Sequence, residues 1–363
     1  MNHEIYMQRC LELAQNGLRA AMPNPSVGAV LVHEGRVIGE GHTSPYGGPH
    51  GEVNCINSVA EADRHLIPEA TLYVSLEPCS HHGKTPPCCD LIIRRQIQNI
   101  IVGTVDPNEK VAGNGIKKLR EAGKEVTVGI LEKECREINR RFFTFHEKLR
   151  PYVILKWAES ADGFLSPSKK SFGGSVAGSR EEKKPVWITN SYSRQLVHKW
   201  RSEEAAILVG TQTVLDDNPQ LDVRDWTGPD PVRIVLDRTG RISGDHSVKN
   251  QKIKTIVLTE KTDLTNLENL LYENVPFDSN LPKAIMEALH RHNLLSVIVE
   301  GGRQTLQTFI DAGLWDEARV FKGRAVFNDG TKAPILGSVP ITRQHIQDDE
   351  LLIFRNYDQH DNI

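Results

Sequence analysis

The chain lacks any long hydrophobic run. No apolar stretch in its 363 residues approaches the roughly 20 residues that a membrane-spanning helix needs. The segment from Met1 to Tyr6 leads into an amphipathic pattern and has no hydrophobic core of a signal peptide. Six cysteines without export features predict reduced thiols and not a disulfide framework. We therefore expect a cytoplasmic protein with no membrane partner.

The sequence also lacks an excess of basic charge. The formal net charge is −3, and residues 1–150 hold 18 Lys and Arg against 18 Asp and Glu. A nucleic-acid enzyme usually carries a strongly basic face. The balance therefore argues against a nucleic-acid partner and favours a small-molecule substrate.

A third absence is the dinucleotide fingerprint G-x-G-x-x-G. None of the clearest predicted strands of the second half is followed by it, which argues against a Rossmann cofactor site. These strands are 152–156, 206–209, 232–236, 255–258 and 296–300. The last one runs into Gly301-Gly-Arg-Gln-Thr305 and a predicted helix. Such a junction suits either a phosphate at a helix N-terminus or a plain tight turn.

Three zinc-grade ligands and one carboxylate are present in the first half. They are His50, Glu52, Cys79 and Cys88, which follow the H-x-E and P-C-x-x-C pattern of zinc deaminases with the second part stretched. Three protein ligands leave a coordination position for water, as catalytic zinc requires. Glu52 would then serve as general base towards the water and as general acid towards departing ammonia.

The local pattern supports this reading of the ligands. Residues 71–76 read as a strand, so Cys79 lies just past its carboxyl end, and a helix is predicted over 86–97. Cys88 falls in the first turn of that helix, where the helix dipole should favour its thiolate. Cys89 could replace Cys88 as a ligand, but the spacing favours Cys88, and we interpret Cys89 as a buried thiol.

Strands and helices alternate through the first half, which predicts a three-layer α/β domain. The expected elements are a helix at 3–20, a hairpin of strands 27–33 and 37–40, a helix at 50–62, strand 71–76, helix 86–97, strand 100–104, helix 114–122, strand 125–128 and helix 132–146. Pro151 ends the last helix and a new strand begins at once. We therefore place the boundary between domains of residues 1–148 and 149–363.

Longer motifs carry a family resemblance over nearly the whole chain. In the first half these are Pro23-Asn-Pro-Ser-Val-Gly28, Gly47-Gly-Pro-His-Gly-Glu-Val53, residues 77–88 and Asp106-Pro-Asn108. In the second half they include Ser160, Asp162-Gly163, Trp187-Ile-Thr189 and residues 210–219. The chain resembles the bifunctional deaminase/reductase of riboflavin biosynthesis. The resemblance implies a cytidine-deaminase-like three-layer α/β/α domain followed by a dihydrofolate-reductase-like α/β domain.

The same resemblance implies an activity and its cofactors. One zinc ion per chain would be held by His50, Cys79 and Cys88, with Glu52 as proton shuttle. The first reaction would hydrolyse the ring amino group of 2,5-diamino-6-(5-phosphoribosylamino)pyrimidin-4-one, and the second would reduce the ribosyl chain to ribityl with NADPH. The family further implies a homo-oligomer, a dimer or tetramer formed through the reductase half.

Further site residues follow from the resemblance alone. Those that would contact the pyrimidine or its ribose phosphate are Asn24, His42, Lys84 and Asn108. Those that would line the NADPH site are Ala158, Trp187, Thr213, Asp217, Gly302, Arg303, Gln304, Thr305, Leu306 and Gln307. Those that would hold the reductase substrate are Arg201, Leu221, Arg224 and Glu300, the arginines by forked contacts to its phosphate, with Lys156 near the hydride.

The chain departs from the family pattern at a few positions. Gly51 stands where alanine is commoner, and the segment around Pro185, after a longer loop at 166–184, lacks the usual serine. Two other functions stay open at this point. One is deamination of another nucleobase with the second half as a binding module. The other is a non-enzymatic zinc protein whose fourth ligand would be His81 or Cys89.

Overall fold

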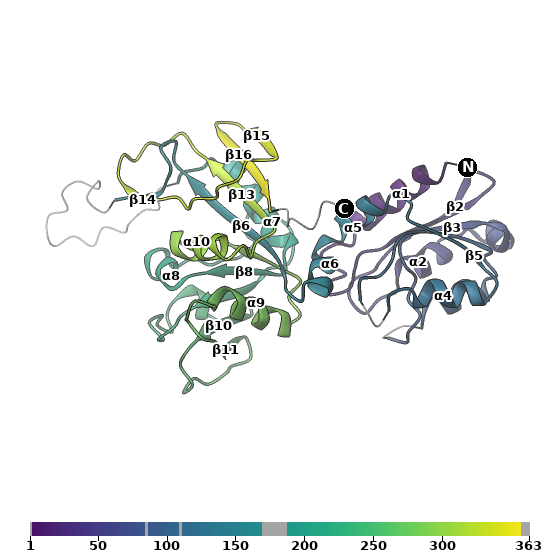
Figure 1. The fold of residues 1–363 in the computed structure, drawn as a ribbon, viewed down its shortest axis with the longest axis horizontal. Coiled ribbons are helices and arrows are strands. Elements are labelled where there is room, and N and C mark those ends of the chain that lie inside the picture. Colours follow the sequence, from purple (N-terminus) through teal and green to yellow (C-terminus); the bar gives the residue numbers. More distant parts are fainter. Residues whose placement is uncertain (1, 84–85, 109–110, 169–186, 357–363) are drawn as a thin grey trace. The chain divides into compact units, whose positions relative to one another are not determined.

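The computed structural model describes residues 2–83, 86–108, 111–168 and 187–356. The chain divides into two compact units, Met1–Leu149 and Arg150–Ile363. Each unit has its own sheet (Figure 1). No helix within the described ranges is long and apolar enough to cross a membrane.

The described residues of the first unit form a five-stranded sheet in the order β2-β1-β3-β4-β5. Its strands are β1 Gly28–His33, β2 Arg36–His42, β3 Thr71–Leu76, β4 Asn99–Thr104 and β5 Glu125–Val128. Strand β1 is antiparallel to β2 and β3, whereas β3, β4 and β5 are parallel. Glu34 and Gly35 join β1 to β2 with positive φ at both positions, the geometry of a type I′ hairpin turn. The predicted hairpin and the strand at 71–76 are confirmed.

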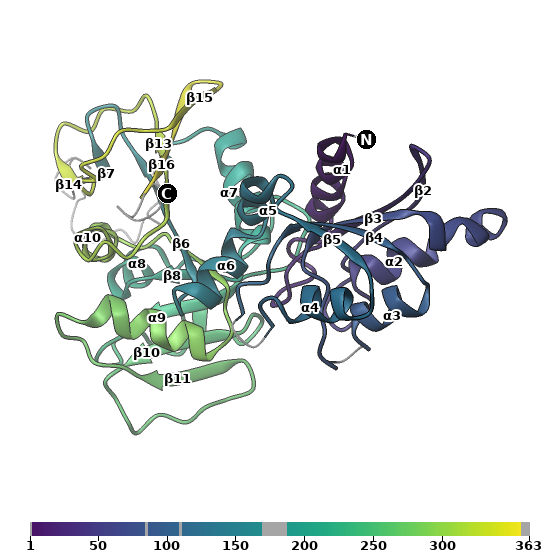
Figure 2. The ribbon, with the colours of Figure 1, turned by 45° about the vertical axis from the view of Figure 1, so that its right-hand side comes forward.

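Helices cover both faces of this sheet, as Figure 2 shows. The helices are α1 His3–Gln15, α2 Gly51–Asn57, α3 Cys88–Arg94, α4 Asn114–Glu121, α5 Glu132–Ile138 and α6 Arg140–Glu147, with a 3-10 helix at Glu61–Glu69. Met7, Cys10 and Leu11 of α1 pack with Val30 of β1 and Cys135 of α5 in one buried cluster. Helices α2, α3 and α4 lie on the opposite face (Figure 2). The expected three layers are therefore present.

Several predicted helices of the first unit are shorter than expected. The helix at 3–20 ends at Gln15, and the helix at 86–97 covers Cys88–Arg94. The helix at 50–62 ends at Asn57, and a 3-10 turn follows. The helix at 132–146 breaks into α5 and α6 at Asn139. The buried Asn139 side chain accepts the N–H of Ser26 and donates to its carbonyl, both at 2.9 Å. This pairing across the fold holds Asn139 at the junction between the two helices.

The second unit has, among its described residues, a nine-stranded sheet in the order β11-β10-β9-β8-β12-β6-β13-β16-β15. Its strands are β6 Tyr152–Glu159, β8 Ala206–Val209, β9 Val232–Leu236, β10 Thr255–Thr259, β11 Leu270–Asn274, β12 Ser296–Val299, β13 Glu317–Lys322, β15 Thr342–Ile346 and β16 Asp349–Arg355. The first seven in spatial order are parallel, and the last two pair antiparallel. A separate antiparallel pair is formed by β7 Phe164–Pro167 and β14 Gly330–Lys332. Strand β7 includes residues 166 and 167 of the loop predicted at 166–184, and residues 169–184 lie outside the described ranges.

Helices of the second unit follow its central strands. They are α7 Ser191–Glu203, α8 Thr211–Asp217, α9 Leu281–Arg291 and α10 Arg303–Asp311. Val197 and Trp200 of α7 pack against Tyr152 and Ile154 of β6. Because side chains alternate along a strand, Lys156 faces α7 as well. Helices α8 and α10 begin directly after β8 and β12, two strands that are neighbours. Parallel α/β sheets place their ligands at this edge.

Candidate active sites

The structure brings the three predicted zinc ligands together. His50 precedes α2, Cys79 follows β3, and Cys88 is the first residue of α3. The Nδ1 atom of His50 lies 3.5 Å from the Cys79 sulfur and 3.4 Å from the Cys88 sulfur. Tetrahedral zinc, with bonds of about 2.3 Å to sulfur and 2.0–2.1 Å to nitrogen, separates N and S ligands by about 3.5 Å. This donor set therefore fits zinc.

Electrostatics at the two cysteines favour metal binding but differ from the expected pattern. The first N–H of α3, that of Cys88, donates to the Cys79 sulfur at 3.3 Å. A hydrogen bond from the Cys88 thiol, with further help from His50, lowers the pKa of Cys79. The neighbouring Cys79 and burial raise the pKa of Cys88. The first N–H of α3 thus points to the Cys79 sulfur, whereas the sequence predicted that this helix start would favour the thiolate of Cys88.

Glu52 lies in the first turn of α2, two residues after the His50 ligand. Its side chain is buried and contacts the Cys88 thiol. Burial, and the nearby Cys79, raise the pKa of Glu52 to about 7. A carboxyl group with a pKa near neutrality accepts and returns a proton readily. Glu52 lies beside the ligands and outside the ligand set.

Cys89 points away from the ligand group. Its thiol donates to the carbonyls of Pro78 at 3.2 Å and Gly115 at 3.5 Å, and the side chain is buried. In the part of the chain that the structure describes, the His, Cys, Asp and Glu side chains close enough to share an ion are His50, Cys79 and Cys88. His81 is exposed and outside this group. The fourth protein ligand of a closed structural site is therefore absent from the described residues.

Glycine lets the start of α2 approach the sheet closely. A Cβ at Gly51 would lie 2.4 Å from the carbonyl oxygen of Val27, and one at Gly41 would lie 2.3 Å from the backbone nitrogen of Cys55. Contacts this short do not occur with a real side chain. The backbone next to the His50 ligand thus rests directly on the strands β1 and β2.

The predicted pyrimidine contacts lie on loops and strand ends of the first unit. His42 ends β2, and its carbonyl accepts a hydrogen bond from Asn54 of α2. Asn24 precedes β1, and its N–H donates to the carbonyl of Ala21. The N–H of Asn108 donates to the carboxylate of Asp106 at 2.8 Å. Lys84 lies outside the described residues.

In the second unit two cationic side chains lie close to one buried carboxylate. Glu300, directly after β12, accepts two hydrogen bonds from Arg201 of α7, at 3.2 and 2.8 Å. Lys156 of β6 lies 3.9 Å from the same carboxylate. Burial would raise the pKa of Glu300, but Arg201 and Lys156 outweigh it and lower the pKa to about 2. Burial lowers the pKa of Lys156. The guanidinium fork of Arg201 is therefore taken by Glu300.

The other predicted substrate residues follow α8. The Leu221 side chain is buried in the core, and its backbone has a φ of 55°. The half-exposed Arg224 pairs with the carboxylate of Asp222 at 2.7 Å. The carbonyl of Asp222 receives both Arg201 at 3.2 Å and the Nδ1–H of His198 at 3.0 Å. Helix α7 thus holds this segment through two side chains.

The predicted NADPH residues cluster in part at the starts of α8 and α10. A Cβ at Gly301 would lie 2.5 Å from the nitrogen of Gly210, so the backbones after β8 and β12 touch. A Cβ at Gly302 would meet the hydroxyl of Thr213 at 3.4 Å. The remaining predicted residues fall in different settings: Ala158 on β6, the exposed Trp187 before α7, Asp217 at the end of α8, and Arg303, Gln304, Thr305, Leu306 and Gln307 in α10. The Leu306 side chain is buried in the core.

The sequence predictions gave no role to Glu77 or His198. Glu77 precedes Pro78-Cys79 and is buried, although it reads as a charged residue at a strand end. His198 is buried on α7, one turn before Arg201, and its Nε2 lies 3.3 Å from Asp225. A histidine three residues before a site arginine on a helix is the signal that could have identified it, because such residues share a helix face.

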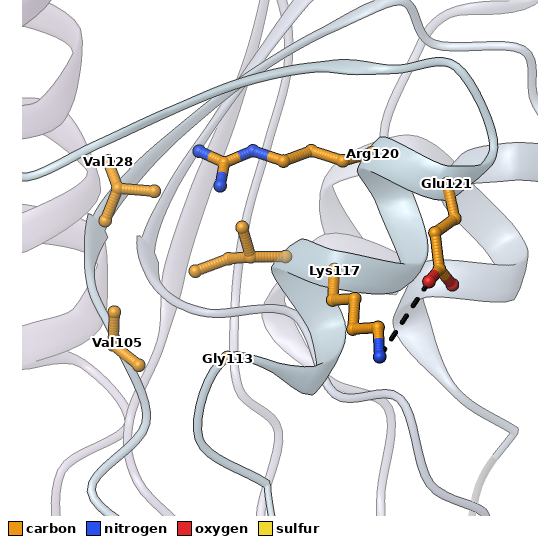
Figure 3. A pocket seen from close by; sticks show the side chains of 7 residues that line it. Val105, Gly113, Lys117, Arg120, Glu121 and Val128 are labelled. Atoms are coloured by element: carbon orange, nitrogen blue, oxygen red, sulfur yellow. Dashed lines mark ion pairs between the residues drawn. The ribbon is translucent and has the colours of Figure 1, made fainter.

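A hollow of about 480 Å³ lies beside α4. Figure 3 shows Lys117 and Arg120 on α4, with Val105 and Val128 across from them. Lys117 pairs with Glu121 at 3.9 Å. None of the residues that line this hollow is among those predicted to bind substrate or cofactor.

Comparison with known proteins matches each of the two units to a protein family. Residues 1–104 match the family model of the cytidine and deoxycytidylate deaminase zinc-binding region, and residues 151–335 match that of the RibD C-terminal domain. A riboflavin biosynthesis protein RibD from Aquifex aeolicus is 38% identical over 97% of this chain and 98% of that protein. The Escherichia coli protein of the same name is 34% identical over 88% of this chain and 87% of its own length.

Solved structures agree with these matches. A diaminohydroxyphosphoribosylaminopyrimidine deaminase/5-amino-6-(5-phosphoribosylamino)uracil reductase from Thermotoga maritima has a TM-score of 0.83 and 37% identity, over 97% of this chain and 98% of that one. One form of Acinetobacter baumannii RibD has a TM-score of 0.82 at 29% identity, with the same coverage. The expected fold class is confirmed. The chain belongs to the RibD family of riboflavin biosynthesis proteins, which joins a zinc-binding deaminase domain to a reductase domain.

Proposed function

We propose that residues 1–148 hydrolyse the ring amino group of 2,5-diamino-6-(5-phosphoribosylamino)pyrimidin-4-one and that residues 149–363 reduce the ribosyl chain of the product to ribityl. The observation that carries the first step is the group of His50, Cys79 and Cys88 with Glu52 beside it. These three residues would hold zinc, which would lower the pKa of a water at neutral pH. Glu52 takes the proton of the attacking water and delivers it to the departing ammonia.

The second step rests on the buried group around Glu300. When bound, NADPH would supply the hydride that reduces the open-chain aldehyde carbon of the substrate. Lys156 orients the substrate oxygen, and its lowered pKa makes the transfer of a proton from Nζ easier. Since Arg201 is committed to Glu300, we assign it to holding that carboxylate ionised. Arg224 is half exposed and remains able to face the substrate phosphate.

The proposal also covers the localisation, the oligomeric state and the ligand contacts of the enzyme. We assign the protein to the cytoplasm, as a dimer or tetramer formed through the reductase half. Asn24, His42, Lys84 and Asn108 are proposed to contact the pyrimidine or its ribose phosphate. The starts of α8 and α10 are proposed to receive the cofactor, because they follow neighbouring parallel strands at the edge where α/β sheets place ligands.

A coupled assay on the phosphoribosylaminopyrimidine tests this proposal. Ammonia release and NADPH oxidation are followed separately in one preparation of the full chain. Both signals are expected, with the second dependent on the first. Ammonia release without NADPH oxidation would contradict the reductase assignment. The absence of both signals would contradict the proposed substrate.

A further inference from the structure

The buried carboxylate of Glu77 receives four backbone N–H groups. It stands two residues before the Cys79 ligand and is 4% exposed. The four donors, with their distances to the carboxylate, are Gly115 at 2.8 Å, Gly113 at 2.9 Å, Asp106 at 3.2 Å and Ile116 at 3.2 Å. Three of these donors belong to the start of α4. The negative charge is thus balanced by oriented peptide groups, and such charge-assisted bonds are stronger than neutral ones.

The bonds of Glu77 lead to a residue proposed to contact substrate. Glu77 fixes the N–H of Asp106, and the Asp106 carboxylate in turn accepts the N–H of Asn108 at 2.8 Å. The carbonyl of Asn108 accepts the N–H groups of Val111 at 2.7 Å and Ala112 at 2.8 Å. The backbone of Asn108 is therefore held on both sides.

The start of α4 also rests on the segment that carries the metal ligand. A Cβ at Gly115 would lie 2.0 Å from the carbonyl oxygen of Pro78. The Cys89 thiol donates to the carbonyls of both residues, at 3.2 Å to Pro78 and 3.5 Å to Gly115. The Glu77-Pro78-Cys79 segment is thus joined to α4 by side-chain bonds and by direct backbone contact.

We propose that Glu77 is a positioning residue for deamination. It holds Asp106–Asn108 and the start of α4 against the Cys79 segment, so that Asn108 stands at a fixed place relative to the zinc ligands. The inference rests on the proposed function, in which Asn108 contacts the pyrimidine. A carboxylate is required because both oxygens accept bonds, whereas the amide of glutamine would direct its NH₂ group at two N–H donors.

The variant Glu77→Gln tests this role in the full-length zinc protein. A contact made equally in ground and transition states affects KM and not kcat. We expect the KM of ammonia release to rise about tenfold and kcat to change less than threefold. Zinc content should stay at one ion per chain, and NADPH oxidation with deaminated substrate should not change. Glu40→Gln is the matched control, since that carboxylate binds Arg9 and should leave KM unaltered.

A double variant tests whether Glu77 acts through Asn108. In an Asn108→Ala background, Glu77→Gln should raise KM less than twofold further. Fully additive effects, or an unchanged KM in Glu77→Gln alone, would overturn the proposal. If Glu77→Gln loses both zinc and ammonia release, Asp106→Ala serves as the second variant, and an unchanged KM in it would overturn the proposal too. Failure of the wild type to release ammonia would instead refute the proposed function.

Discussion

The Arg201–Glu300 pair should be coupled strongly in the stability of the second unit. Arg201→Met removes the guanidinium that donates two hydrogen bonds to Glu300, and Lys156, at 3.9 Å, then remains as an ion-pair partner of the buried carboxylate. Breaking a buried pair from one side typically costs about 3–5 kcal/mol, because the remaining charge stays desolvated. Glu300→Gln in the same protein removes that charge, so the double variant should regain much of the loss.

The lowered pKa of Glu300 gives the magnitude. Its pKa is about 2 in the folded chain against an ordinary value of 4.5. At about 1.4 kcal/mol per pKa unit, ionised Glu300 contributes on the order of 3 kcal/mol to folding. Because the folded pKa is depressed, this contribution is complete above pH 4.5 and is lost as the pH falls towards 2. Stability between pH 5 and 7 should not change through this group.

Tryptophan fluorescence isolates the unfolding of the second unit. All five tryptophans lie in it, at positions 157, 187, 200, 226 and 315. Urea unfolding of the wild type, Arg201→Met, Glu300→Gln and the double variant completes a double-mutant cycle. The expected coupling energy is about 3 kcal/mol or more, because breaking a buried pair from one side costs about 3–5 kcal/mol and the double variant regains much of that loss. Ammonia release by the first unit serves as the control for intact protein.

A coupling energy below about 1 kcal/mol at pH 7 would refute this reasoning, because exposed pairs already reach that value. The free energy of unfolding of the wild type should fall below pH 4.5. If it fell between pH 7 and 5 but not below pH 4.5, protonation of Glu300 would not be the cause of the loss. Persistence of the coupling at pH 2 would contradict the assignment of the charge to Glu300.

Three further predictions concern the two sites. Glu52→Gln should lower ammonia release by about 10²–10⁴-fold, while zinc content and NADPH oxidation with deaminated substrate stay intact; surviving ammonia release would exclude Glu52 as proton shuttle. Removal of zinc by a chelator should abolish ammonia release and spare NADPH oxidation, and joint loss of the two activities would contradict a metal site confined to the first unit. His198→Asn keeps a donor near the Asp222 carbonyl and should retain the KM of the reductase substrate. His198→Gln should raise this KM about tenfold. Equal KM values for the two variants would argue against a role of the hydrogen bond between His198 and Asp222.

Much of the fold could be predicted because its signals are local. The strand at 71–76 is a continuous run of strand-forming residues, and the hairpin turns at Glu34-Gly35. Strand β13 was not predicted, because the charged residues Glu317 and Arg319 interrupt its apolar pattern. In the structure these two residues are buried as an ion pair at 2.6 Å. The break at Asn139 depends on Ser26, which is far away in the sequence.

At the candidate sites, too, local sequence signals could be predicted and contacts between distant residues could not. His50, Cys79 and Cys88 could be predicted because zinc requires particular residue types at particular spacings. Glu77 could not, since its partners are peptide N–H groups that any sequence supplies. Nor could the sequence reveal that Glu300 occupies the fork of Arg201, because these residues meet only when α7 packs on the sheet.

Gly51 sets a limit on engineering this enzyme by majority choice. Replacing a rare residue by the one commonest among relatives is a usual way to raise thermal tolerance. Here the commoner alanine would force its methyl group to within 2.4 Å of the Val27 oxygen, next to the His50 ligand. We expect Gly51→Ala to lower the melting temperature of the first unit and to release zinc at lower chelator concentration than the parent. The backbone around Gly51 leaves no room for the residue that the family resemblance favours at this position.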